Sequence, residues 1–457
     1  MCSRACVWGG SAPRSVFDED VVKAGCLDDF LGGRDPQRAG PHPDVLMMHI
    51  KPHEAVSTRD RSSGVLLHIT SLPSGRIDED AYDFVDWLVE AGQSWWQLLP
   101  LHIPDELGSP YFSRSAFAGF ERLLALPGSR HYDSGEGDEG APQGDWLEEW
   151  VQFAGESERR AQTRFQREWL ALKSYANGRG IRLIGDIPLY VAGDSWDAIS
   201  HPSLFDRSVV AGASPSQNHP EGQRWGMPVF DWPEHARTGF AWWLARLERE
   251  LELFDLLRID HFRGLVKFWE LPLDELDPKR GFWGEGPGIA FFDAARGRLH
   301  GLPLIVEDLG HITPDVIELR EAIGVPGMNV VARVSDIEWR TDSVLYTSTH
   351  DSDTLAGWWQ RWGRDHKPQL AAGATSRKGE HRALLQNVLA VENELVIIPA
   401  QDLLGLGSEA RMNRPGTTDP RNWRWRLEQP LTGEQAATLA SWTAAAGRGG
   451  ASAAEAA

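Results

Sequence analysis

Eight short apolar segments, separated mostly by stretches with helical periodicity, constrain the fold of this chain more than any other feature. Bounded runs of this kind are typical of parallel strands that are buried on both faces. Eight strands that alternate with helices predict an α/β fold, a (β/α)8 TIM barrel with loop insertions. A doubly wound open sheet is the alternative, but no glycine-rich phosphate loop follows the first run. We expect strands at 64–69, 94–101, 181–191, 253–262, 302–309, 327–334, 343–351 and 394–406.

The segments between these runs predict helices over 81–91, 239–252 and 313–323, where apolar residues recur at helical spacing. Between the third and fourth runs the pattern indicates a long loop that contains GQRWGMP (222–228). A second loop-rich stretch contains SPYFSRSAFAG (109–119). Insertions of this kind are typical of the loops that build a functional site on a barrel.

The first part of the 457-residue chain does not share the barrel pattern. Residues 1–60 are rich in turn-forming and polar residues, and we expect a disordered extension there. We expect the barrel to span 61–446 and residues 447–457 to form a disordered tail. All three cysteines lie in the first 26 residues, which excludes a disulfide framework in the body. No apolar signal-peptide core is present, and this favours a cytoplasmic location.

The composition of the chain limits the classes of molecule that it is expected to bind. A net charge of −20 argues against nucleic acid and anionic membranes, and no run approaches the roughly 18 apolar residues of a membrane span. The 21 tryptophans are the unusual feature, because indole faces suit the apolar faces of sugar rings. We assign at least half of them to the core. Three pairs are expected to favour carbohydrate: Trp95–Trp96, Trp358–Trp359 and Trp423/Trp425.

The segment LFDLLRIDHFRG (253–264) places Arg258 and Asp260 two residues apart at the end of a predicted strand. Side chains alternate along a strand, so these two point to the same side. The guanidinium is expected to keep the neighbouring carboxyl group ionised, as a nucleophile or charge stabiliser requires. A structural ion pair at the end of a strand explains this segment alone equally well.

Further acids end other predicted strands at the same edge of the barrel: Glu307, Asp351 and, on the third strand, Asp186. In a TIM barrel the active site lies at the C-terminal strand ends. Cleavage of a glycosidic bond uses two carboxyl groups that flank the bond. Any one acid could instead be a helix N-cap. No serine elbow, metal-spaced histidine pair or phosphate loop competes for this face, so we expect neither a metal nor a cofactor.

Nine segments run in order across residues 64–426: GVLLHITSLPS, AGQSWWQLLPL, SPYFSRSAFAG, RGIRLIGDIPLYVAGDS, GQRWGMPVFDW, LLRIDHFRG, VEDLGHITPDV, THDSDT and PAQDLLGLGSEARMNRPGT. With these the chain resembles the 4-α-glucanotransferases (amylomaltases or disproportionating enzymes, glycoside hydrolase family 77) of the α-amylase clan. The resemblance implies three catalytic residues. Asp260 matches the nucleophile that forms a covalent glucosyl-enzyme, Glu307 the general acid/base, and Asp351 the transition-state stabiliser.

The resemblance also implies sugar contacts for Arg258, His350, Tyr111 and Trp225. Asp186, the fourth strand-end acid, is a further candidate for substrate binding. The implied function is a retaining, hexosyl-transferring 4-α-glucanotransferase of starch and glycogen metabolism. It would move a segment of an α-1,4-glucan or maltooligosaccharide to the 4-hydroxyl of an acceptor. An α-1,4-glucan hydrolase and a non-catalytic glucan-binding protein are the alternatives.

The sequence departs from the family pattern in its loops. Residues 75–80 read GRIDED in place of a GIGDLG-like turn, and ASPSQNHPEGQ replaces a PPD-containing loop before GQRWG. Met227 and Ser352 stand where the family has asparagine. The stretches 334–344 and 130–165 are shorter than usual. We therefore expect intact core chemistry with altered acceptor binding.

Overall fold

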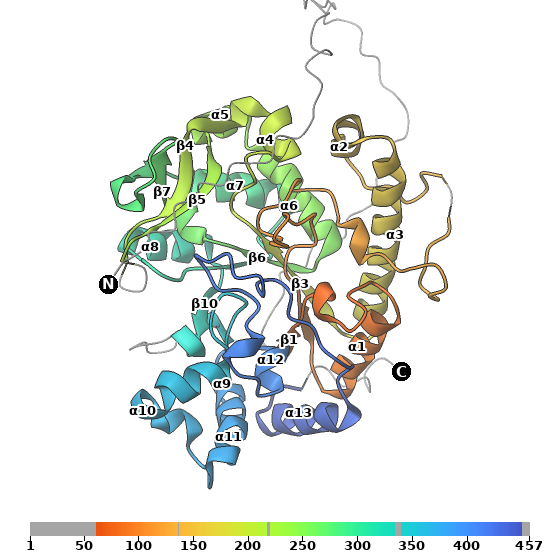
Figure 1. Cartoon of the computed structure of the whole chain (residues 1–457), viewed down its shortest axis with the longest axis vertical. Helices are drawn as coiled ribbons and strands as arrows, with labels where there is room; N and C mark the ends of the chain where they lie inside the picture. Colours follow the sequence, from red (N-terminus) through yellow and green to blue (C-terminus); the bar gives the residue numbers. More distant parts are fainter. Residues whose placement is uncertain (1–60, 136, 217–219, 334–339, 450–457) are drawn as a thin grey trace, which may run out of the picture. The chain divides into compact units, whose positions relative to one another are not determined.

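Figure 1 shows the computed structural model of the chain, which describes residues 61–135, 137–216, 220–333 and 340–449. The predicted extension over 1–60 lies outside the described residues. Eight parallel strands form one sheet in the order β10-β11-β12-β1-β2-β3-β6-β9. They are β1 (Ser62–Leu66), β2 (Trp95–Gln97), β3 (Arg182–Ile187), β6 (Leu256–Ile259), β9 (Leu304–Val306), β10 (Gly327–Val330), β11 (Ser343–Tyr346) and β12 (Leu395–Pro399).

The sheet closes almost completely into a barrel. Its two end strands, β9 and β10, approach each other, and the amide of Val306 donates to the carbonyl of Pro326 at 3.0 Å. The predicted (β/α)8 barrel is therefore confirmed, and each of the eight apolar runs supplies one strand. The strands are shorter than the runs. The run at 394–406, for example, leaves the sheet after Pro399 and begins the short helix α12 (Ala400–Leu403).

Alternation along the strands divides the core into two clusters. Inward-facing side chains fill the barrel, and outward-facing ones pack under the helices. In β2, for example, Trp95 belongs to the interior cluster and Trp96 to the outer one, and both are fully buried. The interior cluster is Leu66, Trp95, Ile184, Leu256, Ile305, Met328, Val330, Val344, Tyr346, Leu395 and Ile397.

Helices surround this barrel, and Figure 1 shows α1 and α3 on one side of it and the α9–α11 group below. The predicted helices at 81–91, 239–252 and 313–323 correspond to α1, α6 and α8. The longer helices are α1 (Glu79–Glu90), α2 (Trp146–Ala154), α3 (Ser157–Asn177), α6 (Ala241–Leu253), α7 (Gly288–Leu299), α8 (Pro314–Ile323), α11 (Arg377–Leu389) and α13 (Gly433–Ala445). Shorter ones are α4 (Trp196–Ser200), α5 (Trp232–Arg237), α9 (Leu355–Trp358) and α10 (Arg364–His366).

Helix α1 illustrates why these segments are helical. The side chain of Asp78 accepts a hydrogen bond from the amide of Asp80 and so caps the first turn. Buried apolar residues then recur along one face at a spacing of three and four residues. The buried face consists of Ala81, Tyr82, Phe84, Val85, Trp87 and Leu88.

A second sheet, absent from the sequence-based expectation, lies beside the barrel. It is antiparallel, with the order β5-β4-β7-β8, and Figure 1 shows β4, β5 and β7 together at the upper left. Its strands are β4 (Phe205–Ala213), β5 (Gln223–Phe230), β7 (Lys267–Pro272) and β8 (Phe282–Glu285). The stretch expected to be a loop around GQRWGMP is thus mostly β5. No period of two marks β4 and β5, because exposed or half-buried residues fill one part of each strand and four consecutive buried residues fill another.

The last described residues are anchored to the bottom of the barrel. Arg448 is fully buried and donates to the carbonyls of Leu389 at 2.6 Å, Val391 at 2.7 Å and Ser62 at 3.0 Å. This arginine falls in the stretch expected to be a tail, so the packed part of the chain extends beyond residue 446. Within the described ranges, no helix is long and apolar enough to cross a membrane.

Candidate active site

The alternation that fills the barrel also places the charged side chains of the site. Asp186, Arg258 and Glu307 each stand two residues beyond an inward-facing apolar residue: Ile184, Leu256 and Ile305. They therefore point inward at the C-terminal end of the barrel. Asp260 stands two further residues along from Arg258. The barrel hydrogen bonds continue to this level, because the amide of Asp260 donates to Ile187 O and that of Glu307 to Ile259 O, each at 2.9 Å.

Arg258 joins three carboxylates. Its Nη1 lies 2.7 and 2.8 Å from the two oxygens of Asp186, and its Nη2 lies 3.0 Å from Asp260 Oδ1 and 3.5 Å from Glu307 Oε2. The third nitrogen, Nε, contacts the sulfur of Met328 at 3.4 Å. One arginine atom thus lies close to both Asp260 and Glu307. Their two nearest recorded oxygens are at most about 6.5 Å apart, the sum of its two distances.

Asp186 is fully buried and also accepts a hydrogen bond from the hydroxyl of Tyr111 at 2.8 Å. Tyr111 comes from the long segment after β2. Its ring stacks on that of His350 with centroids 5.0 Å apart, and Trp423 lies 5.5 Å from it. These contacts bring the tyrosine and the histidine, 239 positions apart in the sequence, onto one wall of the site.

Glu307 is held by the turn that follows Asp260. The amide of His261 donates to Glu307 Oε2 at 2.8 Å, and His261 has φ of 50°. A non-glycine residue in this left-handed region is uncommon, and such conformations often occur at functional sites. On the other side Arg333 Nη1 lies 3.7 Å from Glu307 Oε1. The turn therefore fixes the second carboxylate relative to the first.

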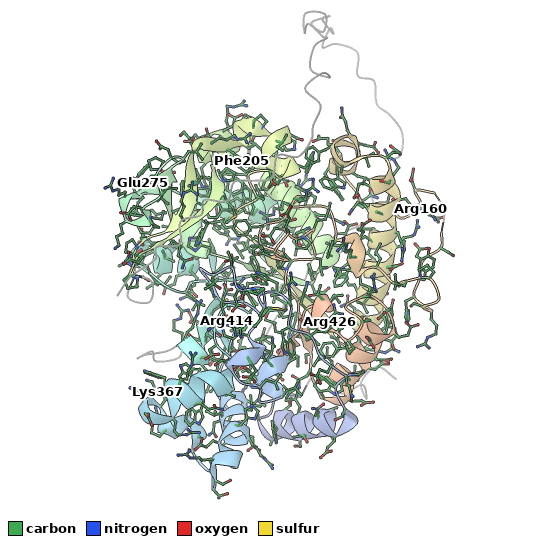
Figure 2. The ribbon with its side chains drawn as sticks, in the orientation of Figure 1. Arg160, Phe205, Glu275, Lys367, Arg414 and Arg426 are labelled. Carbon is green, nitrogen blue, oxygen red and sulfur yellow. The ribbon has the colours of Figure 1, made fainter. Side chains whose placement is uncertain are left out.

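Asp351 lies in the segment between β11 and α9. Asn413 donates its side-chain amide to Asp351 Oδ1 at 2.7 Å, and the main-chain amide of Asn413 donates to the carbonyl of His350 at 2.9 Å. His350 Nε2 lies 3.6 Å from Asp351 Oδ2. Asn413 belongs to the long segment between α12 and α13, whose Arg414 and Arg426 Figure 2 places near the middle of the view.

Trp225 projects from β5 and forms another side of the site. Its ring meets that of His261 edge-on with centroids 4.8 Å apart, and Tyr190 lies 6.0 Å from it. The indole nitrogen donates to Gln223 Oε1 at 2.9 Å. The antiparallel sheet thus carries this indole to the residue that follows Asp260.

All eight residues singled out from the sequence therefore meet at this end of the barrel, through the contacts described above. The expectation that three tryptophan pairs favour carbohydrate has a mixed outcome. Trp95, Trp96, Trp358 and Trp359 are buried core residues, so the expectation of sugar-binding pairs is wrong for them. Trp423 is half-buried and does line the site beside Tyr111.

The sequence reasoning missed four side chains that contact the proposed catalytic residues or their neighbours. Asn413 lies within the quoted PAQDLLGLGSEARMNRPGT motif, whose polar NRP segment was the available signal. His261 was visible beside Asp260. Met328 and Arg333 lie within the sixth apolar run and carried no distinguishing pattern.

The three carboxylates that contact Arg258 shift one another's proton affinities. Burial raises the pKa of Asp260 well above its usual range; Arg258 opposes this, and the carboxylates of Glu307 and Asp186 add to it. Burial also acts on Glu307, but Arg258, Arg333 and the amide of His261 outweigh it and lower the pKa. The expectation that Arg258 keeps Asp260 ionised is therefore not met, because burial and the neighbouring carboxylates outweigh the guanidinium.

Two buried histidines lie on the Asp351 side. Burial lowers the pKa of His350, although Asp351 raises it, and burial and His350 together lower the pKa of His68 to about 3. Both rings are therefore neutral near pH 7 and act as hydrogen-bonding groups. A cavity of about 10 Å³ separates them from the segment around Arg411.

Among the described residues, no group of three or more His, Cys, Asp or Glu side chains is arranged to hold a metal ion.

Comparison with known proteins agrees with this geometry. The model of glycoside hydrolase family 77, described as 4-alpha-glucanotransferase, matches residues 67–152 and 152–432. The 4-alpha-glucanotransferase of Streptococcus pneumoniae is 33% identical over 479 positions, covering 82% of this chain and 95% of the relative. The Thermus thermophilus protein of the same name is 34% identical and covers 80% and 95%. The amylomaltase of Streptococcus agalactiae, solved with acarbose, has a TM-score of 0.75 at 28% identity and covers 85% and 100%.

The lengths of these matches indicate that this chain has shorter loops than its relatives. Since 82% of the 457 residues is about 375, about 100 of the 479 aligned positions in Streptococcus pneumoniae have no counterpart in this chain. The barrel is thus retained while loops are shortened, as the sequence indicated. The family match covers most of the chain, and the strand order, the clustered acids and the neighbour structure agree with it. The chain belongs to glycoside hydrolase family 77, the 4-α-glucanotransferases.

Proposed function

We propose that this protein is a retaining 4-α-glucanotransferase in which Asp260 is the nucleophile, Glu307 the general acid/base and Asp351 the stabiliser of the transition state. The observation that carries the proposal is the sharing of one Arg258 nitrogen between Asp260 and Glu307. Retaining enzymes hold the two carboxyl groups about 5–5.5 Å apart and inverting ones about 6.5–9.5 Å. The upper bound of about 6.5 Å set by Arg258 favours the retaining class.

In the first half-reaction, a carboxylate oxygen of Asp260 attacks the anomeric carbon of a glucose unit. The bond from that carbon to the glycosidic oxygen breaks, and Glu307 gives its proton to the departing oxygen. The product is an ester between Asp260 and the glucan segment. Asp351, held by Asn413 at 2.7 Å, is placed to bind hydroxyls of the reacting ring and favour its distorted form.

The position of the proton follows from charge. Asp260 and Glu307 titrate as an interacting pair, so the pair as a whole holds the proton that the reaction needs. As the glycosidic bond stretches, positive charge grows at the anomeric carbon beside Asp260 and favours its ionised form. The proton is then carried by Glu307, where bond cleavage requires it. Arg258, which touches both groups, stabilises whichever of them is ionised.

In the second half-reaction, Glu307 removes the proton from the 4-hydroxyl of an acceptor sugar. The hydroxyl oxygen attacks the anomeric carbon, the ester to Asp260 breaks, and a new α-1,4 bond forms with the original anomeric configuration. We propose α-1,4-glucans and maltooligosaccharides as donors and acceptors. The aromatic side chains of Tyr111, Trp225 and Trp423, gathered around the site, support this choice.

We place this reaction in the cytoplasm. The support is the distribution of cysteines, all three of which precede residue 27 and leave the barrel free of disulfides.

Hydrolysis of the same intermediate by water is the competing outcome. The missing loop positions noted above favour easier access of water, because closed loops keep water from a reactive intermediate. We therefore expect transfer to prevail at high oligosaccharide concentration, with more hydrolysis than in relatives that have longer loops.

Incubation with pure maltotriose tests the proposal. Transfer gives glucose together with a ladder of longer maltooligosaccharides, while the total number of reducing ends stays constant. Products limited to glucose and maltose, with reducing ends rising in step, would establish a hydrolase instead. Binding of maltotriose with no change in products would favour the non-catalytic alternative.

A further inference from the structure

A second polar groove is lined in part by the segments that follow Asp260 and Glu307, and it takes no part in the reaction described above. It has a volume of about 260 Å³ and is formed by the turn after β6, the β7–β8 hairpin and the segment between β9 and α8. Figure 1 shows β7 and α8 on the same side of the barrel. The residues that matter here are Arg263, Lys267, Trp283, Glu285, His311 and Asp315.

Arg263 forms the floor of the groove. It is only 6% exposed, and its Nη1 donates to the carbonyl of His311 at 2.8 Å and to Thr313 Oγ1 at 2.9 Å. Its guanidinium carbon lies 4.1 Å from the centre of the Trp283 ring. Its Nε is buried and has no hydrogen-bond partner among the described residues. A buried donor without a partner is costly, so Arg263 is an unusual residue to line a groove.

Three charged side chains at the rim are paired loosely. Lys267 Nζ lies 3.7 Å from Glu285 Oε1 and 3.8 Å from Asp315 Oδ2, distances too long for direct hydrogen bonds. Lys267 Nζ, the Glu285 carboxylate and Asp315 Oδ2 therefore keep hydrogen-bonding capacity for a ligand, whereas Asp315 Oδ1 already accepts from the Thr313 hydroxyl and the Val316 amide. Ammonium and carboxylate groups side by side offer both donors and acceptors, which vicinal sugar hydroxyls require. A simple anion would meet the two carboxylates, and a cation would meet Lys267 and Arg263.

Trp283 supplies an apolar surface beside these polar groups. It is 38% exposed, and its ring lies 6.1 Å from that of His311 with 27° between their planes. An indole next to mixed polar groups suits a neutral polyhydroxylated ligand. The chain charge of −20 likewise disfavours an acidic one.

Two residues that line the groove are close in sequence to the proposed catalytic residues. Arg263 stands three residues after Asp260, and His311 four residues after Glu307. We propose that this groove is a second contact for the α-1,4-glucan, which binds a glucose unit of a long chain away from the reacting ring. The inference rests on the proposed function, since that function defines the ligand.

Affinity for amylose and for maltotriose, measured by titration calorimetry, tests the groove. Asp260→Asn serves as the background, because it binds glucan without forming the covalent intermediate. Trp283→Ala in that background should weaken binding of amylose about three- to tenfold, and clearly more than binding of maltotriose. Lys267→Ala, which removes only long ion pairs, should act in the same direction without threatening the fold.

Phe282→Ala is the matched control. Phe282 is 47% exposed on the same strand, but it does not line the groove, so its removal should leave both affinities unchanged. The inference is overturned if the Trp283 and Lys267 variants bind amylose as the background does. It is also overturned if amylose and maltotriose affinities fall equally. A background protein that binds neither glucan, together with a wild type inactive on maltotriose, would instead refute the proposed function itself.

Discussion

Among the described residues of the site, Arg258 is the side chain that touches the most carboxylates. It is 3% exposed and contacts Asp186, Asp260 and Glu307. A buried guanidinium with several carboxylate partners has little freedom to move, because Asp186 holds Nη1 while Asp260 and Glu307 both contact Nη2. Its planar fork thereby sets the positions of the proposed nucleophile and the proposed acid/base together.

Arg258→Lys should retain the charge and lose the geometry. A lysine ammonium cannot bind Asp186 through two oxygens and still reach both Asp260 and Glu307. We expect kcat/KM for maltotriose to fall about 100- to 1000-fold, in line with the loss of a preorganised donor in a catalytic site. Steady-state assays of this variant and of Arg298→Lys, whose arginine pairs with Glu248 on the surface, make the comparison. Activity of Arg258→Lys within tenfold of the parent would contradict the assigned role.

Asn413→Ala should change the pH dependence. Burial raises the pKa of Asp351, but His350 and then the Asn413 amide outweigh it, so the pKa lies below its usual value. Removing the amide moves this pKa up, and the acid limb of the kcat/KM profile should shift to higher pH. A carboxylate with a lowered pKa stabilises the fold above its ordinary pKa, and this stability is lost as pH falls through the folded pKa.

The Asn413 variant should accordingly be less stable than the parent at pH 7, by about 1 kcal/mol, with the difference shrinking towards low pH. Asn387→Ala is the control, since the amide of Asn387 donates to main-chain carbonyls away from the site. An unchanged acid limb would show that Asn413 does not tune Asp351.

The charged residues of the site could be found from the sequence because the ends of the strands can be recognised in it. Asp186, Arg258 and Glu307 follow apolar runs at a fixed spacing, and the barrel turns that spacing into proximity. Proton affinity could not be found in this way. It depends on how many carboxylates share Arg258, and that number is set by three strands meeting in space.

At the scale of secondary structure, the parallel strands were predictable and the antiparallel sheet was not. Barrel strands are buried on both faces and stand out as apolar runs. In β4 and β5 exposed polar residues are mixed with buried ones, a glycine interrupts each strand, and β5 also contains a proline. The strand character of these segments comes from pairing with each other and with β7, which is a non-local cause.

The hydrogen bonds of Arg448 at the bottom of the barrel give a prediction for the end of the described chain. Arg448 bonds carbonyls beside β1 and β12, and its removal would leave those buried acceptors without partners. Deletion of residues 448–457 should therefore lower the unfolding free energy in urea by about 3 kcal/mol. Deletion of 450–457, which keeps Arg448, should leave it nearly unchanged. Equal stability of the two truncated proteins would contradict an anchoring role for Arg448.

At the scale of the whole molecule, the proposed catalytic and sugar-contacting side chains among the described residues lie between Tyr111 and Trp423. Deletion of residues 1–60 should thus leave the melting temperature and the maltotriose activity nearly unchanged. Calorimetry and product analysis of the shortened protein check this directly. A large loss of stability would show that the removed segment packs against the barrel.

In the proposed mechanism, Asp260 becomes covalently linked to the sugar. A glucosyl donor that carries fluorine on the ring slows breakdown of the intermediate and allows it to accumulate. Peptide mapping of the trapped protein should find one glucosyl residue, attached to Asp260, and Asp260→Asn should take up none. Label on Glu307, or turnover of maltotriose with no covalent adduct at any carboxylate, would contradict the account.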